Sequence, residues 1–488
     1  LSPDAGAGPA VPVKVHNVDS AADVLEAGRS QKVADDTAYL LDTLGPNTGP
    51  QLRRTSMLRL AKLLVQADFR THIFTQGRFA KVLGLLYGVV EDASLNEAAA
   101  AMLLVLYHDP RLFAYSREVV DLLLKLVATI SRTPKPIATT GPAKRRQLLE
   151  KRQTAKTRDA VVATLALIEL QQPFSGAPFV TSGLLAMETL SCLYAALGTD
   201  PSSQLLAEAQ AEMRVRGGLD DVAQFAHTEI RKWDNYEEEG APGGAMGPVE
   251  VQATLSAVSR SLRCLLEAIR GNDGNRTYLS CLRDAQLLQS LLRFIFVAES
   301  LLGSSDQAVL SCACSALCNA MKMLLGLTNN SAAACSAFDR KVVSCICRVA
   351  VGEVDGGRLP PEYEYDLSSL ATTLLINLTE HNAENRTVVL GAALQGDQTM
   401  MSRLGAVVVD KCVRTERQQD LSTTRERTFM NVAGAYAAIL FGCICFDHPD
   451  AIGQARTALA VDDIAPVQKH LEDYLLFEQA AGMASTNS

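Results

Sequence analysis

Three cysteines that lie close together have the residue type and spacing that best fit a metal site. Cys312, Cys314 and Cys318 follow the pattern Cys-x-Cys-x3-Cys, and residues four apart share one face of a helix, where two thiolates can bind zinc. A structural zinc site needs four ligands, however, and no histidine or second cysteine pair has a matching spacing. The neighbouring Ala, Leu and Met residues are typical of a helix core. The sequence therefore predicts packed thiols, without a metal or a cofactor.

The motifs of common enzyme classes are absent from the sequence. It contains no Gly-x4-Gly-Lys-Ser/Thr phosphate-binding loop, no Gly-x-Ser-x-Gly nucleophile turn and no His-Glu-x-x-His zinc motif. The seven histidines are scattered, and no two of them lie four residues apart. We therefore expect a protein without catalytic residues. An enzyme of an unrecognised kind is the rival hypothesis, and it would need polar groups that converge in a pocket.

Charged residues gather in two short segments. The basic segment contains Lys144, Arg145, Arg146, Lys151, Arg152, Lys156 and Arg158. Such a run could bind DNA or an acidic protein surface, but we favour an exposed loop followed by the first turn of a helix. The acidic run Glu237–Glu239 is interpreted as solvent-exposed linker. The net charge of −8 argues against bulk binding to phosphate backbones, and we expect no direct sequence-specific binding to nucleic acids.

The composition indicates a folded protein with an aliphatic core. Of 488 residues, 48% are hydrophobic and only 5% are aromatic, so Leu, Ala, Val and Ile must supply most of the buried surface. The twelve cysteines lie in helical apolar patterns rather than in a short disulfide framework, which indicates a reducing intracellular compartment. There is no signal peptide and no uninterrupted apolar run near the roughly 20 residues of a membrane helix, so we expect no membrane contact.

Helical periodicity dominates the chain. Between about residues 362 and 380, apolar residues recur at helical spacing in one continuous stripe. Ser94 and Glu97 form a capping-box pattern at the start of another helix. The segments 118–130 and 431–445 are apolar nearly all round, so we expect helices that neighbours cover on most sides.

Two segments of the second half share one pattern. Residues 261–279 and 370–390 each contain a long apolar helix, a polar turn and then Asn-Arg-Thr at the start of a short helix. At these turns we expect Asn275 and Asn385 to cap the short helices. A repeated unit of this kind can bury its apolar face only against its neighbours. The sequence therefore predicts an all-α superhelix of HEAT or armadillo-like repeats, in units of about 40–47 residues.

Shifts in composition divide this predicted array into two lobes. Residues 1–15 are rich in Ala, Gly and Pro and predict a flexible tail. An acidic, Gly-rich linker at 236–248 separates an N-terminal helical repeat lobe at 16–235 from a C-terminal one at 249–488. A further irregular stretch at 353–361 interrupts the helices of the second lobe.

Several segments, taken in order, resemble the wings apart-like family. Residues 181–190, Thr-Ser-Gly-Leu-Leu-Ala-Met-Glu-Thr-Leu, are close to the family's Gly-x-Leu-Ala-Met-Glu-Thr-Leu. Residues 68–77, Asp-Phe-Arg-Thr-His-Ile-Phe-Thr-Gln-Gly, are similar to its Phe-Arg-x-His turn. Further collinear matches extend the resemblance over about residues 13–485; they lie at 35–41, 102–109, 217–220, 275–279, 325–329, 374–386 and 436–445.

This resemblance implies a non-enzymatic scaffold on chromatin in the nucleus. Members of the family bind the cohesin ring and its HEAT-repeat regulatory partner, and they promote cohesin release from DNA by favouring opening of the SMC–kleisin junction. The implied partners are an SMC ATPase head, the kleisin and the HEAT-repeat accessory subunits. The alternative is an armadillo-type adaptor that binds extended peptides, as in nuclear import or a catenin. Import adaptors line their groove with repeated Trp and Asn, whereas this chain has a single Trp.

A scaffold binds partners through polar side chains that lie off its core. Glu188 lies nearly opposite the apolar face of its helix at about 100° per residue, and Arg70 follows an apolar residue that we expect to anchor its turn. Other candidates fall in segments that match surface regions of the family. For Arg70 and Glu188 an internal salt bridge or a helix cap is an equally open alternative. The predicted protein-binding residues are Asp35, Asp36, Arg70, Glu188, Thr428 and Val432.

Overall fold

The structure is a computed structural model in which most of the chain forms helices. The predicted tail at 1–15 and residues 236–245 of the predicted linker lie outside the described residues. Those described are 21–90, 92, 95–109, 115–129, 141–170, 174, 180–200, 204–233, 246–283, 285–354, 357–359, 361–380, 382–392, 394, 398–410, 424–459 and 465–486.

A unit of three helices recurs along the second half of the chain. Its long first helices are α12 (Pro248–Ile269), α15 (Gln307–Thr328), α18 (Pro361–Glu380) and α21 (Thr424–Cys445). The second helices are α13 (Asp273–Cys281), α16 (Ala332–Cys335), α19 (Ala383–Leu390) and α22 (Pro449–Leu459). The third helices are α14 (Gln286–Ser300), which the 3-10 turn η3 (Leu301–Gly303) extends, α17 (Arg340–Ala350), α20 (Met400–Val408) and α23 (Ala465–Thr486).

Related units make up the first half. They comprise α2 (Pro50–Leu64), α3 (Ala67–Thr75) and α4 (Phe79–Tyr87); then α5 (Asn96–Tyr107) and α6 (Arg117–Ala128); then α8 (Ser182–Leu197), α9 (Leu205–Val215) and α10 (Gly218–Arg231). Two long helices stand outside the pattern, α1 (Ala21–Thr43) and α7 (Gly141–Leu165). The basic run at 144–158 lies wholly within α7, so the expectation that part of it forms a loop is wrong.

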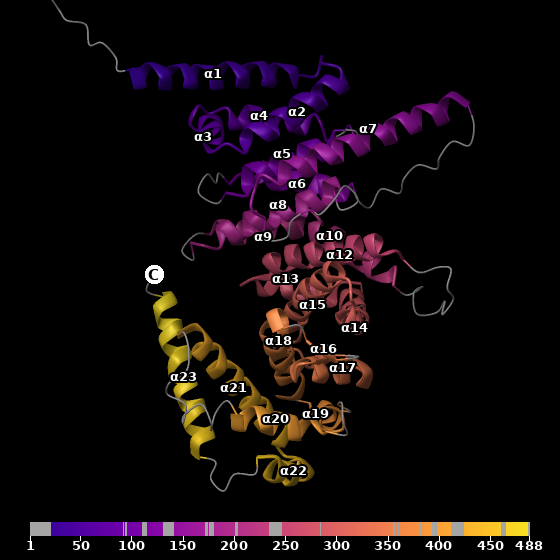
Figure 1. Ribbon diagram of the computed structural model, residues 1–488, viewed down its shortest axis with the longest axis vertical. Coiled ribbons are helices and arrows are strands. Elements are labelled where there is room, and N and C mark those ends of the chain that lie inside the picture. The colour runs from indigo at the N-terminus through magenta and orange to yellow at the C-terminus, as the bar shows by residue number, and fades with distance from the viewer. Residues whose placement is uncertain are drawn as a thin grey trace, which may run out of the picture.

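The units stack in chain order into one elongated, curved array (Figure 1). Each first helix packs against the next, from α2 on α5 through α8, α12, α15 and α18 to α21. Third helices of successive units also pack against each other, for example α10 against α14. A single hydrophobic core extends from Leu40 to Ala455. The predicted all-α repeat superhelix is confirmed; the division into two lobes stays a prediction, and α10 and α12 pack directly against each other across it.

The repeat is longer than the sequence pattern suggested. First helices begin at residues 248, 307, 361 and 424, so successive units start 54 to 63 residues apart. Units of 40–47 residues contain two or three helices. Here the first helices alone are 20 to 22 residues long, and the sequence pattern of long helix, turn and short helix did not include the third helix.

The polar turn of each repeat fastens the short helix to the long helix before it. Asn382 caps α19 by accepting a hydrogen bond from the backbone N–H of Asn385 at 3.0 Å. The Asn385 side chain instead donates to the carbonyls of Leu378 in α18 and Cys335 in α16, both at 3.0 Å. Asn275 makes the same kind of contacts at the start of α13. The expected capping role of Asn275 and Asn385 is therefore wrong, because the residue three positions earlier is the cap.

Other expected elements agree with the structure. Helix α18 spans the stretch predicted at 362–380, and α6 and α21 contain most of the two segments that are apolar all round. Ser94 lies outside the described residues, and α5 begins at Asn96. The irregular stretch at 353–361 contains a small antiparallel hairpin of β1 (Glu353–Val354) and β2 (Gly357–Arg358).

By length and mean hydropathy, two described segments could span a membrane, which the sequence expectation did not anticipate. They are Gln286–Gly303 and Gln307–Thr328. More than half of each segment is buried inside the array, at 56% and 61%. Core helices of a stacked array share the length and apolar composition of membrane helices, so the two properties alone do not distinguish them.

Candidate protein-binding surface

The six predicted protein-binding residues lie on four separate helices. Asp35 and Asp36 are on α1, and Thr428 and Val432 are on α21. These two helices occupy opposite ends of the array (Figure 1). The side chain of Thr428 lies outside the described part, and Val432 is half-buried. The structure therefore does not bring the predicted residues together into one site.

The two aspartates on α1 form an accessible acidic edge. Asp35 is exposed and accepts a hydrogen bond from Gln31 at 2.8 Å. Asp36 lies 3.5 Å from the Arg59 guanidinium of α2, and this ion pair is largely open to solvent. Tyr39, one turn further on, is 56% exposed. Exposed ion pairs of this kind contribute little to stability, so these carboxylates can exchange their present partners for others.

Arg70 faces the interior instead of the surface. Its side chain is only 4% exposed and donates to the carbonyls of Leu64 and Val65, where α2 ends, at 2.8 and 2.7 Å. A third bond joins it to the buried carboxylate of Asp109, just after α5, at 3.0 Å. The expectation that Arg70 lies off the core is wrong. Its contacts match the alternative, a salt bridge combined with capping of the preceding helix.

Glu188 is likewise buried, with 1% of its surface exposed. Its carboxylate forms ion pairs with Arg260 and Arg263 of α12. Arg260 is fully buried, and its guanidinium carbon lies 3.7 Å from the ring centroid of Phe174. Burial lowers the pKa of Arg260, and the neighbouring carboxylate acts in the opposite direction. This buried cluster joins α8 to α12, the first helices of two successive units.

The position of α8 explains why its outward face was misassigned. The helix packs against α5, α6 and α12, so side chains are buried all round it from Gly183 to Ser191. A helical wheel assigns one buried face and one exposed face, which holds only for a helix at the surface. Direct binding of a partner by Arg70 or Glu188 stays a prediction, and the contacts in this structure give both residues an internal role.

Sequence reasoning missed an exposed aromatic residue near the C-terminal end. Phe446, directly after α21, is 67% exposed. Its carbonyl accepts a hydrogen bond from Arg386 at 2.8 Å, and the arginine also lies 5.2 Å from its ring centroid. The following residue, Asp447, has a left-handed backbone with φ of 54°. The Asp-His-Pro turn after Phe446 was the available signal, because it ends the buried helix and leaves the ring outside.

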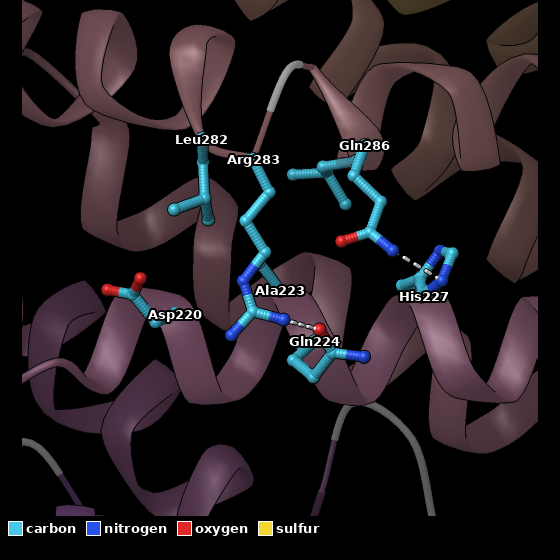
Figure 2. Close-up of a pocket in the computed structure, with 8 residues that line it drawn as sticks. Asp220, Ala223, Gln224, His227, Leu282, Arg283 and Gln286 are labelled. Carbon is cyan, nitrogen blue, oxygen red and sulfur yellow. Dashed lines mark hydrogen bonds between the residues drawn. The ribbon is translucent and has the colours of Figure 1, made fainter.

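A small polar pocket lies between α10 and the turn that joins α13 to α14 (Figure 2). Gln286 and His227 face each other there at 2.7 Å, and Arg283 donates to Gln224 across the opening. The cavity volume is about 10 Å³, which is room for about one water molecule. This pocket is therefore too small for a substrate or a cofactor.

Of the three clustered cysteines, Cys314 is buried, Cys312 and Cys318 are partly buried, and none forms a disulfide. Burial raises the pKa of Cys314 to about 12 and that of Cys318 to about 11. Within the described ranges, no group of three or more His, Cys, Asp or Glu residues is arranged to hold a metal ion.

Comparison with known proteins gives consistent matches along most of the chain. Residues 17–385 match the family described as "Wings apart-like protein regulation of heterochromatin". The human Wings apart-like protein homolog is 25% identical over 397 residues, which cover 76% of this chain and 31% of that protein. The fruit fly (Drosophila melanogaster) Protein wings apart-like is 24% identical over 404 residues, covering 78% of this chain and 22% of the fly protein. The chain thus spans less than a third of either relative.

Solved structures show only distant similarity. A crystal structure of the SYS-1/POP-1 complex aligns with a TM-score of 0.41 at 12% identity, covering 91% of this chain and 77% of that one. A circular tandem repeat protein aligns with a TM-score of 0.22 at 14% identity, covering 94% and 93%.

Proposed function

Because this chain belongs to the wings apart-like family, we propose that it is a nuclear, chromatin-associated scaffold that binds cohesin and promotes its release from DNA. Its partners are an SMC ATPase head, the kleisin and the HEAT-repeat accessory subunits. The observation that carries this proposal is the family match over residues 17–385, which includes the acidic edge of α1. Thr428 and Val432 lie beyond the matched residues.

The architecture supports a role in binding rather than in catalysis. The array hides its apolar residues between successive units and presents polar helix edges to solvent. Stacked repeats of this kind provide extended binding surfaces. In the acidic edge, Asp35 is exposed and Asp36 is partly exposed and only weakly paired, so the edge can dock on a basic patch of a partner.

Release of DNA then follows from preferential binding to one state of the ring. If the scaffold binds the open SMC–kleisin junction more tightly than the closed junction, binding shifts the population towards the open form. About 1.4 kcal/mol of differential affinity changes the ratio of the two states tenfold. No chemical step by the scaffold itself is required.

A capture experiment on the exposed acidic edge tests this proposal. The variant Asp35→Lys/Asp36→Lys is expected to lower recovery of cohesin subunits by at least tenfold, because two attractive charges become repulsive. The matched control is Glu472→Lys/Asp473→Lys, another adjacent acidic pair on an exposed part of a helix, α23, with a glutamine four residues before it. The control should bind like the unchanged chain. Equal recovery with both variants would show that the acidic edge does not bind cohesin. No recovery with the unchanged chain would contradict the proposal that the protein binds cohesin.

The alternative function, an adaptor for extended peptides, would need Trp and Asn side chains that are exposed to a peptide, and the described residues do not support it. The single tryptophan, Trp233, is 2% exposed. The side-chain amide of Asn319 donates to the Ser259 carbonyl of α12 at 3.1 Å, and that of Asn377 donates to Thr328 at 3.2 Å. These amides join neighbouring first helices, so they are already bonded within the array and not displayed to a peptide.

A further inference from the structure

Helix α7 is an addition to the repeat pattern and projects from the side of the array (Figure 1). Its C-terminal half packs on the array: Thr157, Val161 and Leu165 are buried there, and α7 contacts both α5 and α2. Towards the N-terminal end of α7 the side chains become more exposed, and Leu149 is 53% exposed. The described contacts therefore anchor the helix through its C-terminal half.

Ion pairing fixes the direction in which α7 projects. Arg158 lies 2.6 Å from the carboxylate of Glu97, which is 12% exposed on α5. One turn earlier, Gln153 accepts a hydrogen bond from Arg54 of α2 at 3.3 Å. These contacts lie next to the exposed residues 149–152 and hold the helix against two neighbours, so this exposed segment has a fixed position on the array.

The projecting half carries positive charge. Lys151, Arg152 and Lys156 are exposed, and within the described part of the chain no ion pair or hydrogen bond involves their side chains. The whole of α7 contains seven basic and two acidic residues, although the chain has a net charge of −8. Such a local reversal of sign creates a positive field where the rest of the surface is acidic.

We propose that α7 binds the phosphate backbone of duplex DNA without sequence preference. Duplex DNA carries one negative charge per roughly 1.7 Å of its axis, and residues 151–156 extend about 8 Å along the helix at 1.5 Å per residue, so the three side chains face several phosphates. Protein interfaces usually depend on aromatic anchors and are depleted in lysine. The exposed side of α7 between 149 and 156 contains no aromatic residue, which favours a polyphosphate over an acidic protein.

This contact goes beyond the proposed binding of cohesin and does not depend on it. It gives the scaffold a direct, salt-sensitive contact with the DNA. The absence of sequence preference follows from the chemistry, because lysine and arginine side chains on phosphates do not read base edges.

The test is the affinity of the purified chain for a random-sequence duplex of about 30 base pairs, measured by fluorescence anisotropy over a series of salt concentrations. We expect a dissociation constant between about 10⁻⁶ and 10⁻⁴ M at physiological salt. In the variant Lys151→Gln/Arg152→Gln/Lys156→Gln, affinity should fall at least tenfold. The slope of log K against log salt should decrease by about 2.7, since each phosphate contact contributes about 0.9. Circular dichroism verifies that the variant keeps its helix content.

A second triple variant controls for net charge. Lys322→Gln/Arg340→Gln/Lys341→Gln removes three exposed charges from α15 and α17 and should leave DNA binding unchanged. Equal loss in both variants, or no loss in the α7 variant, overturns the proposal. Tighter binding of poly-glutamate than of the duplex at the same salt also overturns it and indicates an acidic protein instead. The α7 variant should still capture cohesin, so the two proposals can fail separately.

Discussion

Removal of the Glu188 carboxylate should destabilise the array at the contact between α8 and α12. In the variant Glu188→Ala, the buried cluster keeps two guanidinium groups and loses the carboxylate with which both are paired. Arg260 cannot reach solvent, because none of its side-chain surface is exposed. Arg263 is 13% exposed and can partly turn outward.

The expected loss of stability depends on the Arg260 charge, which stays buried when Glu188 is removed. Breaking a buried ion pair by removing one partner typically costs about 3–5 kcal/mol, because the other charge stays desolvated. The ring of Phe174, whose centroid lies 3.7 Å from the Arg260 guanidinium carbon, offsets only part of this cost, since a cation over an aromatic ring contributes about 0.5–2 kcal/mol. We therefore expect Glu188→Ala to lower the opening free energy of α8 and α12 by about 3 kcal/mol or more.

Native-state hydrogen exchange measures this quantity helix by helix. Protection should fall in α8 and α12 and stay nearly unchanged in α21, which lies at the C-terminal end of the array and does not adjoin either helix. Replacing both partners, as in Glu188→Met/Arg260→Met, should restore most of the stability, since an apolar pair of similar volume avoids the desolvation cost. As a surface comparison, Asp36→Ala should cost less than about 1 kcal/mol. A loss below about 1 kcal/mol for Glu188→Ala would refute the assignment of a buried cluster.

Three further predictions follow from contacts described above. Arg70→Ala should lower the free energy of unfolding by about 3–5 kcal/mol in urea titration, because it removes the guanidinium that pairs with the buried Asp109 carboxylate; a loss similar to that of an exposed arginine would contradict this. Asn385→Ala should cost about 1–3 kcal/mol in the same assay, since two buried carbonyls lose their donor, and an unchanged midpoint would argue against the shared turn. At pH 8 iodoacetamide should label the exposed Cys281 well before Cys314, because burial raises the pKa of the Cys314 thiol to about 12 and only the thiolate reacts; mass spectrometry identifies the order, and equal rates would contradict the burial. Raising the pH towards 12 should increase the rate at Cys314.

Much of the fold was predictable because its main determinant is local. The apolar stripe at 362–380 corresponds to α18 within one residue, and the two segments that are apolar all round correspond to α6 and α21. Periodicity in a sequence reports how one helix buries its own residues. It does not report how many helices form a unit, so the third helix of each repeat and the length of 54 to 63 residues had to come from the structure.

The candidate site was less predictable for the same physical reason. Asp35 is exposed as expected, whereas Glu188 and Arg70 are buried and form ion pairs with residues that lie far away in the sequence. The partners of Glu188 are 72 and 75 residues distant, at Arg260 and Arg263. The segment around Glu188 is apolar on nearly every side, and the argument that placed α6 inside the stack would also have placed α8 there. Nothing in the sequence near Glu188 identifies Arg260 as the partner of Glu188.

The separation between α1 and α21 has a consequence for any assembly that engages both ends of the array. A continuous core links the two ends, so it fixes the span between a contact at Asp35 and one at Val432. Once the first contact forms, the second is made at an effective concentration set by that span, and two weak attachments can together gain 10²- to 10⁴-fold in avidity by the usual order of magnitude. The gain vanishes when the partner's sites are spaced differently. An array that made both contacts would therefore distinguish assemblies by the distance between their binding sites.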